Sequence, residues 1–294
     1  MKYFCLCMSP AIDALVRLDR APEGVGEIFK DVADEENVGG KGVNVARWLA
    51  LRGADVVCGG LIGEDNAVLF ERELARYGIG DSFLRVPGPT RRNEMITWPG
   101  GAFKVNRAAF PGLNCGDDLL GRVLERLGGD DGFAGSVVVI SGSLPGACGA
   151  GFYAEAVREL KSRGAFVVLD ASGEALRLGV AAHPDVVKPN AEECKALVGF
   201  VPASPDEFSR ATEMLRKDVP HPIISDGAGG CWFDGEFAPA PKVDVVDTTA
   251  AGDTLLAEWC FSRDPRKAVA AGSAACGMPG SKPPDPGKVF GGES

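Results

Sequence analysis

Short apolar runs alternate along this chain with segments in which apolar residues recur at helical spacing. The runs are rich in Val, Ile and Leu, and each is short enough to form one strand of a buried sheet. They cover residues 3–8, 55–61, 136–141, 165–170, 186–188 and 222–225. The helical segments cover residues 41–52, 66–77, 117–127, 151–162, 191–199 and 205–217. This alternation predicts an α/β fold in which helices cover both faces of a mostly parallel central sheet.

Three segments depart from this pattern. Residues 14–38 and 83–110 alternate apolar and polar positions without an intervening helix, as in the run Glu94-Met95-Ile96-Thr97-Trp98. Such alternation predicts strands with one exposed face, and an ordinary edge hairpin would satisfy it. Residues 277–294 are rich in Pro and Gly and have no helical period, so a loose tail is expected there.

Composition narrows the class of protein. At 294 residues the chain is long enough for one large α/β domain. The net charge of −10 argues against nucleic-acid binding, which favours basic surfaces. No apolar run approaches the roughly 18 residues of a membrane span, and the N-terminus lacks the cleavage region of a signal peptide. Nine scattered cysteines without a C-x-x-C pair are typical of small buried side chains in a reducing compartment, so a cytoplasmic location is expected.

The segment VDTTAAGDTLL, residues 246–256, carries the strongest chemical signal. Asp253 directly follows Ala250, Ala251 and Gly252, where an apolar helix is expected to begin. The free N–H groups and the positive dipole end of a first helical turn suit an anion such as a phosphoryl group. A carboxylate beside such a site repels the anion, unless it accepts the proton of a hydroxyl that attacks phosphorus. The alternative is that Asp253 only caps the helix.

A glycine-rich turn near the N-terminus is the second signal. Gly39, Gly40 and Gly42 surround Lys41 just before a helical segment that contains Asn44. This spacing fits neither the G-x-G-x-x-G fingerprint nor a Walker A loop. The short motifs SGSLP, KPN and SDGAGG each follow a predicted strand. They should therefore lie at the carboxyl edge of the sheet, where ligands bind in open α/β folds.

Together these motifs resemble the ribokinase-like superfamily, and within it the phosphofructokinase-B family of carbohydrate kinases. The glycine turn resembles the signature GGKGxNxAxxLxxLG, and residues 247–253 resemble DTxxAGD. SPAID at 9–13 and TRRN at 90–93 resemble NPAxD and TRxN. SGSLP at 141–145 is matched, and KPNAEE at 188–193 and ISDGAGG at 224–230 resemble KPNxxE and VSxGxxG. The resemblance implies a single three-layer ribokinase-like core and a small β-sheet lid, formed by about 14–37 and 84–107, that closes over a sugar.

The resemblance also implies a role for each matching residue, with ATP as phosphoryl donor. Asp253 would be the general base, and the amides of Ala250, Ala251 and Gly252 would stabilise the anion. The sugar would contact Asp13, Gly39, Gly40, Lys41, Asn44, Arg91 and Ser143. The nucleotide would contact Lys188, Asn190, Ser225, Gly227, Gly230 and Thr248. Asn190 and Glu193 would organise Mg²⁺ through water, although the same pair also fits an ordinary capping box at a helix start.

The matching branch of the family phosphorylates sugars that already carry a phosphate, such as fructose 1-phosphate, fructose 6-phosphate or tagatose 6-phosphate. Arg91 fits that substrate class, because a planar guanidinium pairs well with a phosphate. Two departures leave a free-sugar kinase, or a sugar-binding member without turnover, as alternatives. Glu27 stands where the branch often has a basic residue, and the region after Asp253 is shortened, with no final helix expected after Ala275. By analogy with this branch, a homodimer through the lid is expected.

Overall fold

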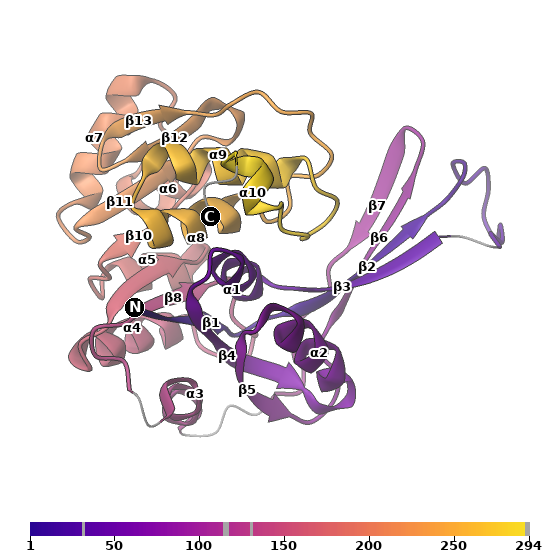
Figure 1. Ribbon diagram of the computed structural model, residues 1–294, viewed down its shortest axis with the longest axis horizontal. Coiled ribbons are helices and arrows are strands. Elements are labelled where there is room, and N and C mark those ends of the chain that lie inside the picture. Colours follow the sequence, from indigo (N-terminus) through magenta and orange to yellow (C-terminus); the bar gives the residue numbers. More distant parts are fainter. Residues whose placement is uncertain (31–32, 114–117, 130–131, 292–294) are drawn as a thin grey trace.

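The computed structural model describes residues 1–30, 33–113, 118–129 and 132–291, and its core is one twisted sheet covered by helices (Figure 1). The sheet has nine strands in the order β13-β12-β11-β10-β9-β8-β1-β4-β5. Adjacent strands from β11 through β5 pair in parallel, whereas β12 and β13 pair antiparallel at one edge. The strands are β1 Lys2–Cys7, β4 Asp55–Gly63, β5 Gly80–Val86, β8 Val137–Ser141, β9 Phe166–Asp170, β10 Val186–Val187, β11 His221–Ser225, β12 Gly230–Phe233 and β13 Glu236–Pro239.

The predicted α/β class is confirmed, because all six predicted strands and all six predicted helices are present. The predicted start of the third helix, Asp117, lies outside the described residues. Strands β5, β12 and β13 were not predicted: β5 and β13 are the edge strands, β12 lies beside β13, and none of the three has a long continuous apolar run. The helices are α1 Lys41–Leu51, α2 Ala67–Tyr77, α3 Leu119–Gly128, α4 Phe152–Ser162, α5 Gly173–Val180, α6 Ala191–Val198, α7 Pro205–Leu215, α8 Ala251–Ser262, α9 Pro265–Cys276 and α10 Pro286–Val289.

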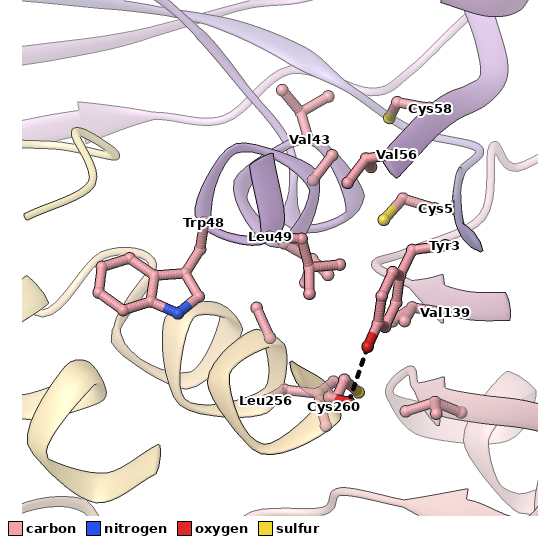
Figure 2. Close-up of a cluster of buried hydrophobic side chains, with 14 of the residues drawn as sticks. Tyr3, Cys5, Val43, Trp48, Leu49, Val56, Cys58, Val139, Leu256 and Cys260 are labelled. Carbon is pink, nitrogen blue, oxygen red and sulfur yellow. Dashed lines mark hydrogen bonds between the residues drawn. The ribbon is translucent and has the colours of Figure 1, made fainter. Parts of the chain in front are cut away.

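The side chains of strand β1 pack against helices on both faces of the sheet. Successive side chains of a strand point to opposite faces of the sheet. Tyr3 and Cys5 accordingly pack with residues of α1 and α8, whereas Phe4 and Leu6 pack with residues of α3 and α4. Figure 2 shows the first of these clusters, in which the Tyr3 hydroxyl donates a hydrogen bond to the carbonyl of Cys260 in α8 at 3.3 Å. The layer of α1 and α8 on this face carries the residues of the candidate site.

A second, four-stranded sheet projects from the core (Figure 1), in the order β3-β2-β6-β7. Its strands are β2 Ala11–Arg17, β3 Ala33–Gly39, β6 Arg92–Trp98 and β7 Gly101–Val105. The alternative of an ordinary edge hairpin is therefore wrong. Residues 84–86, expected to belong to this sheet, are part of β5 in the large sheet, and residues 31–32 lie outside the described part of the chain. Because β2 follows β1 and β3 leads directly into α1, the small sheet is attached beside the glycine turn.

The expectation of a loose C-terminal tail is wrong for residues 277–291. The chain forms the short helix α10, and Phe290 packs edge-on against Trp48 of α1, with ring centroids 6.2 Å apart. The Arg52 guanidinium lies 4.7 Å from the Phe290 ring, and Lys282 forms an ion pair with Glu35 of β3. Sequence periodicity did not predict that this segment is packed, because individual side chains hold it in place instead of a continuous apolar face. Residues 292–294 lie outside the described range.

Candidate active site

Asp253 lies in the first turn of α8 and is buried, with 5% of its surface exposed. Its Oδ2 accepts a hydrogen bond from Nδ2 of Asn44, in the first turns of α1, at 2.8 Å. Burial raises the pKa of Asp253 above its usual value, while nearby Lys41 and the Asn44 hydrogen bond act in the opposite direction. The structure thus brings together the predicted base and a predicted sugar-binding residue that are far apart in sequence.

The backbone at the start of α8 is held in an unusual conformation. Ala250, the residue before the helix, has φ 64°, which is in the left-handed region that non-glycine residues seldom adopt. Its carbonyl accepts the N–H of Thr254 at 2.9 Å, so the strained residue starts the helical hydrogen-bond ladder. The next residues, Ala251 and Gly252, begin the first turn, whose N–H groups have no acceptor within the helix, although the Ala251 N–H donates to the Thr248 carbonyl at 3.4 Å. This geometry suits an anion at the helix start.

Asp170 is a site residue that the sequence did not reveal. It ends strand β9, has 0% exposure, and both its oxygens lie 3.2 Å from Nζ of Lys41. Nζ of Lys188 lies 3.4 Å from Asp170 Oδ1. Burial acts to raise the pKa of Asp170, but the two lysines outweigh it and lower the pKa. The available signal was an acidic residue at the carboxyl end of a predicted strand.

The two lysines face the start of α8. A Cβ added to Gly252 would lie 3.4 Å from Nζ of Lys188, so the ammonium group sits beside the glycine backbone. Burial acts to lower the pKa of Lys41, but Asp170 and Asp253 outweigh it and raise the pKa, so Lys41 is a cation at neutral pH. One buried carboxylate therefore holds two cations next to a helix N-terminus and a second carboxylate. This arrangement can bind a multiply charged anion and take up a proton beside it.

Close packing explains why glycine is needed at positions 39 and 40 of the turn. A Cβ on Gly39 would lie 2.2 Å from Oδ2 of Asp13, and a Cβ on Gly40, whose φ is 115°, would lie 2.8 Å from Cα of Pro10. Asp13 also accepts a hydrogen bond from Nδ2 of Asn93 in β6 at 2.9 Å. The predicted sugar residues Asp13, Gly39 and Gly40 are thus in direct proximity at the root of the small sheet.

A pocket lies between the small sheet and the core, next to Asp13. Residues of β2, β3, β6 and β7 line one side, and residues that precede α8 or follow α9 line the other. Its walls combine amides and carboxylates with a lysine from β7. The polar lining residues include Asp13, Glu35, Asn37, Asn93, Glu94, Lys104, Asp247, Thr249 and Ser281.

The remaining residues that were predicted to bind the sugar are Arg91 and Ser143. Arg91, just before β6, donates hydrogen bonds to the carbonyls of Ser9, Pro10 and Arg107 at 3.0, 3.2 and 3.1 Å. Its guanidinium therefore fastens the small sheet to the end of β1. Ser143 is exposed on the loop after β8, near the start of α1. The acidic departure, Glu27, is ion-paired with Arg20, so its charge is compensated locally.

The residues predicted to bind nucleotide and metal follow neighbouring strands. Asn190 and Glu193 form a complete capping box at α6: Asn190 Oδ1 accepts the Glu193 N–H at 2.8 Å, and Glu193 Oε2 accepts the Asn190 N–H at 2.9 Å. Ser225 is the last residue of β11 and forms a parallel β-bridge with Asn190. Gly227, with φ 51°, begins a short 3₁₀ turn, and Gly230, with φ 130°, begins β12. Thr248 is exposed before α8.

The chain belongs to the pfkB family of carbohydrate kinases, whose model matches residues 8–278. It is 37% identical over 230 residues to the 1-phosphofructokinase of Rhodobacter capsulatus, which covers 76% of this chain and 72% of that relative. It is 32% identical over 268 residues to the 1-phosphofructokinase of Vibrio cholerae, with 88% of this chain and 82% of the relative covered.

Solved structures confirm the ribokinase-like fold. The crystal structure of phosphofructokinase-2 from Escherichia coli in complex with substrates and products superposes with a TM-score of 0.85 at 24% identity, covering 99% of this chain and 98% of that one. Ribokinase of Arabidopsis thaliana, complexed with ribose and ATP, gives 0.74 at 22% identity, covering 99% and 97%. Among the described residues, no helix is both long and apolar enough to cross a membrane.

Proposed function

We propose that this carbohydrate kinase transfers the γ-phosphoryl group of ATP to a hydroxyl of a sugar phosphate of the fructose 1-phosphate, fructose 6-phosphate or tagatose 6-phosphate class. The observation that carries the proposal is the convergence of Asp253, Lys41 and Lys188 at the start of α8. The relatives named 1-phosphofructokinase support the sugar-phosphate acceptor.

Each residue has a physical task in this reaction. Asp253 accepts the proton of the attacking hydroxyl while Asn44 holds its other oxygen. The N–H groups of Ala251 and Gly252 and the ammonium groups of Lys41 and Lys188 stabilise the charge that spreads over the transferred group. Asp170 keeps both lysines in place and reduces their mutual repulsion. Closure of the small sheet over the pocket would exclude water, which otherwise competes as phosphoryl acceptor.

Magnesium fits the oxygen-rich start of α6. The capping box occupies Glu193 Oε2 and Asn190 Oδ1, and the second Glu193 oxygen stays available to a hydrated cation. When bound with ATP, Mg²⁺ would supply positive charge that offsets the negative charge of the phosphates. Glu193 would hold this hydrated ion while its hydrogen bond to the backbone of Asn190 keeps the carboxylate oriented.

A free-sugar kinase is the second candidate, and two observations favour it. The Arg91 guanidinium is already bonded to three carbonyls, and the pocket places Asp13, Glu35 and Glu94 beside Lys104. Carboxylates disfavour a phosphate unless cations outweigh them.

A coupled assay of ADP release over free sugars and sugar phosphates separates these candidates. We expect the highest kcat/KM for a ketohexose phosphate. A higher kcat/KM for free ribose or fructose than for every hexose phosphate would reject the sugar-phosphate acceptor and leave the kinase assignment intact. No ADP release above the background ATPase rate with any acceptor would leave a sugar-binding protein without turnover.

We also propose a cytoplasmic homodimer formed through the small sheets. Phe103 of β7 is 59% exposed, and Ile28, in the loop between β2 and β3, is 79% exposed. Exposed apolar side chains on a projecting sheet favour self-association. The tetrameric inhibited form of phosphofructokinase-2 from Escherichia coli shows that a structural neighbour can assemble.

A further inference from the structure

Arg47, a buried residue of α1, contacts Asn44, which in turn contacts the candidate base Asp253. It has 1% exposure, and its Nη2 donates to Asn44 Oδ1 at 3.0 Å and to the carbonyl of Val38. Its Nη1 donates to Oε1 of Glu73, on α2, at 3.1 Å. Asn44 in turn donates to Asp253. A continuous buried chain therefore runs from Glu73 through Arg47 and Asn44 to Asp253.

Donor and acceptor rules give this chain a single direction. A guanidinium can only donate hydrogen bonds, so the Asn44 atom that faces Arg47 must be the carbonyl oxygen. A carboxylate can only accept them, so the atom that faces Asp253 must be the amide nitrogen. Without Arg47, rotation of the amide by a half-turn would bring the Asn44 oxygen against Asp253. A protonated Asp253 could donate to that oxygen, whereas an ionised Asp253 would be repelled by it.

We propose that Arg47 is a positioning residue that locks the Asn44 amide and thereby keeps the base Asp253 ionised and oriented toward the acceptor hydroxyl. This inference rests on the function proposed above. It assigns Arg47 a task in catalysis although the residue is only 1% exposed and acts through Asn44. The charged or titratable groups that face Asp253 are Lys41, Lys188 and Asp170, and those that face Arg47 are Glu73, Asp13 and the Tyr77 hydroxyl.

A purely structural role explains the arrangement less well. The Nε of Arg47 is buried without a hydrogen-bond partner among the described residues, which carries a desolvation cost. Replacing buried ion pairs by apolar side chains of similar volume is often neutral or stabilising in other proteins. Packing alone therefore does not explain why a charged side chain occupies position 47.

The test compares the pH dependence of kcat/KM in the wild type and in Arg47→Met, with the same acceptor and saturating MgATP. We expect the acid limb of the variant to move up by about 0.5 to 1.5 pH units, because the proton now competes better for Asp253. On the acid side of both limbs this gives a loss of roughly 3- to 30-fold, and the loss should shrink to within about threefold at high pH. Recovery at high pH is the result that a structural defect would not produce.

Arg52→Met is the matched control. Arg52 caps the C-terminal end of the same helix and pairs with the buried Glu258 at 3.0 Å, and among the described residues it has no hydrogen bond to Asn44 or Asp253. This variant should lose stability and leave the acid limb unmoved. In an Asn44→Ala background, Arg47→Met should cause no further shift, because the amide it acts through is gone. Arg47→Lys, which retains one donor and a charge, should fold and give a smaller shift.

Three outcomes would overturn the inference: an unmoved acid limb in Arg47→Met and Arg47→Lys, a loss that is equal at every pH, or an equal shift in Arg52→Met. A wild type without phosphoryl transfer would instead reject the proposed function. In that case the effect of Arg47 on Asp253 can still be tested, by measuring the pKa of the Asp253 carboxyl group by NMR in the wild type and in Arg47→Lys. An unchanged Asp253 pKa there would overturn it.

Discussion

At the scale of single residues, the site depends on which charges are paired. Asp170 has two lysine partners, whereas Asp253 has a neutral amide on one oxygen and leaves the other for a ligand. The pKa of Asp170 is accordingly lowered and that of Asp253 is raised. The two buried acids thus have different roles. Asp170 binds two cations, and Asp253 can exchange a proton.

Asp253→Asn should lower kcat by roughly two to four orders of magnitude and leave ligand affinity nearly unchanged, because the amide has the same shape but accepts no proton. Steady-state kinetics and calorimetric titration with the acceptor measure the two effects. A variant that keeps more than about a tenth of the wild-type kcat, with chemistry rate-limiting, would contradict the role of base.

Arg91→Ala should raise KM for the preferred sugar phosphate at least tenfold, which corresponds to about 1.4 kcal/mol, and scarcely affect any activity on a free sugar. Arg92→Ala is the neighbouring control, because Arg92 forms a surface ion pair with Glu36. Equal losses on both acceptors would show that Arg91 serves only to fasten the small sheet.

At the scale of elements, the small sheet and the C-terminal segment meet across the pocket. The small sheet is joined to the core at the ends of β2 and β3 and through residues near Arg91. The C-terminal segment contributes Ser281 to the opposite wall and Lys282 to the ion pair with Glu35. A movement of the sheet would therefore open or close the pocket.

Sugar binding should protect amides in segments 14–30, 33–37 and 87–107 from hydrogen exchange, while strand β8 stays unchanged. The measurement is exchange detected by mass spectrometry with and without the acceptor. Equal protection in both states would mean that the small sheet does not close, and that another element excludes water.

Phe290→Ala should destabilise the protein by about 2 kcal/mol, since the partly buried ring packs on Trp48 and Arg52. Chemical denaturation measures the change in the free energy of unfolding. Val68→Ala, on an exposed position of α2, should change it by less than about 0.5 kcal/mol. An equally small effect of Phe290→Ala would mean that the C-terminal segment detaches in solution.

At the scale of the whole molecule, the projecting small sheet is the surface that we propose for a partner. The large sheet is covered by helices on both faces, whereas the projecting small sheet presents exposed apolar residues such as Phe103. The net charge of −10 opposes association at low salt and is screened at physiological ionic strength.

The protein should therefore elute with about twice the chain mass of 30.7 kDa in light-scattering chromatography. Phe103→Asp should shift it toward the monomer, because a charge in an apolar interface must be desolvated. Glu213→Lys, on α7 away from the small sheet, is the charge-change control. A monomeric wild type at micromolar concentration would contradict the proposed dimer.

Local patterns in the sequence predicted six of the nine strands of the large sheet, most of the helices and the position of the helix start that carries Asp253, because each follows from periodicity and turn chemistry among neighbouring residues. Only the tertiary structure decided that Asn44 meets Asp253 across 209 positions, or that Lys41 meets Asp170 across 129. It also decided that Phe290 anchors the segment expected to be loose. The physical reason is that contacts between distant segments depend on the order of strands in the sheet, which periodicity along the chain does not encode.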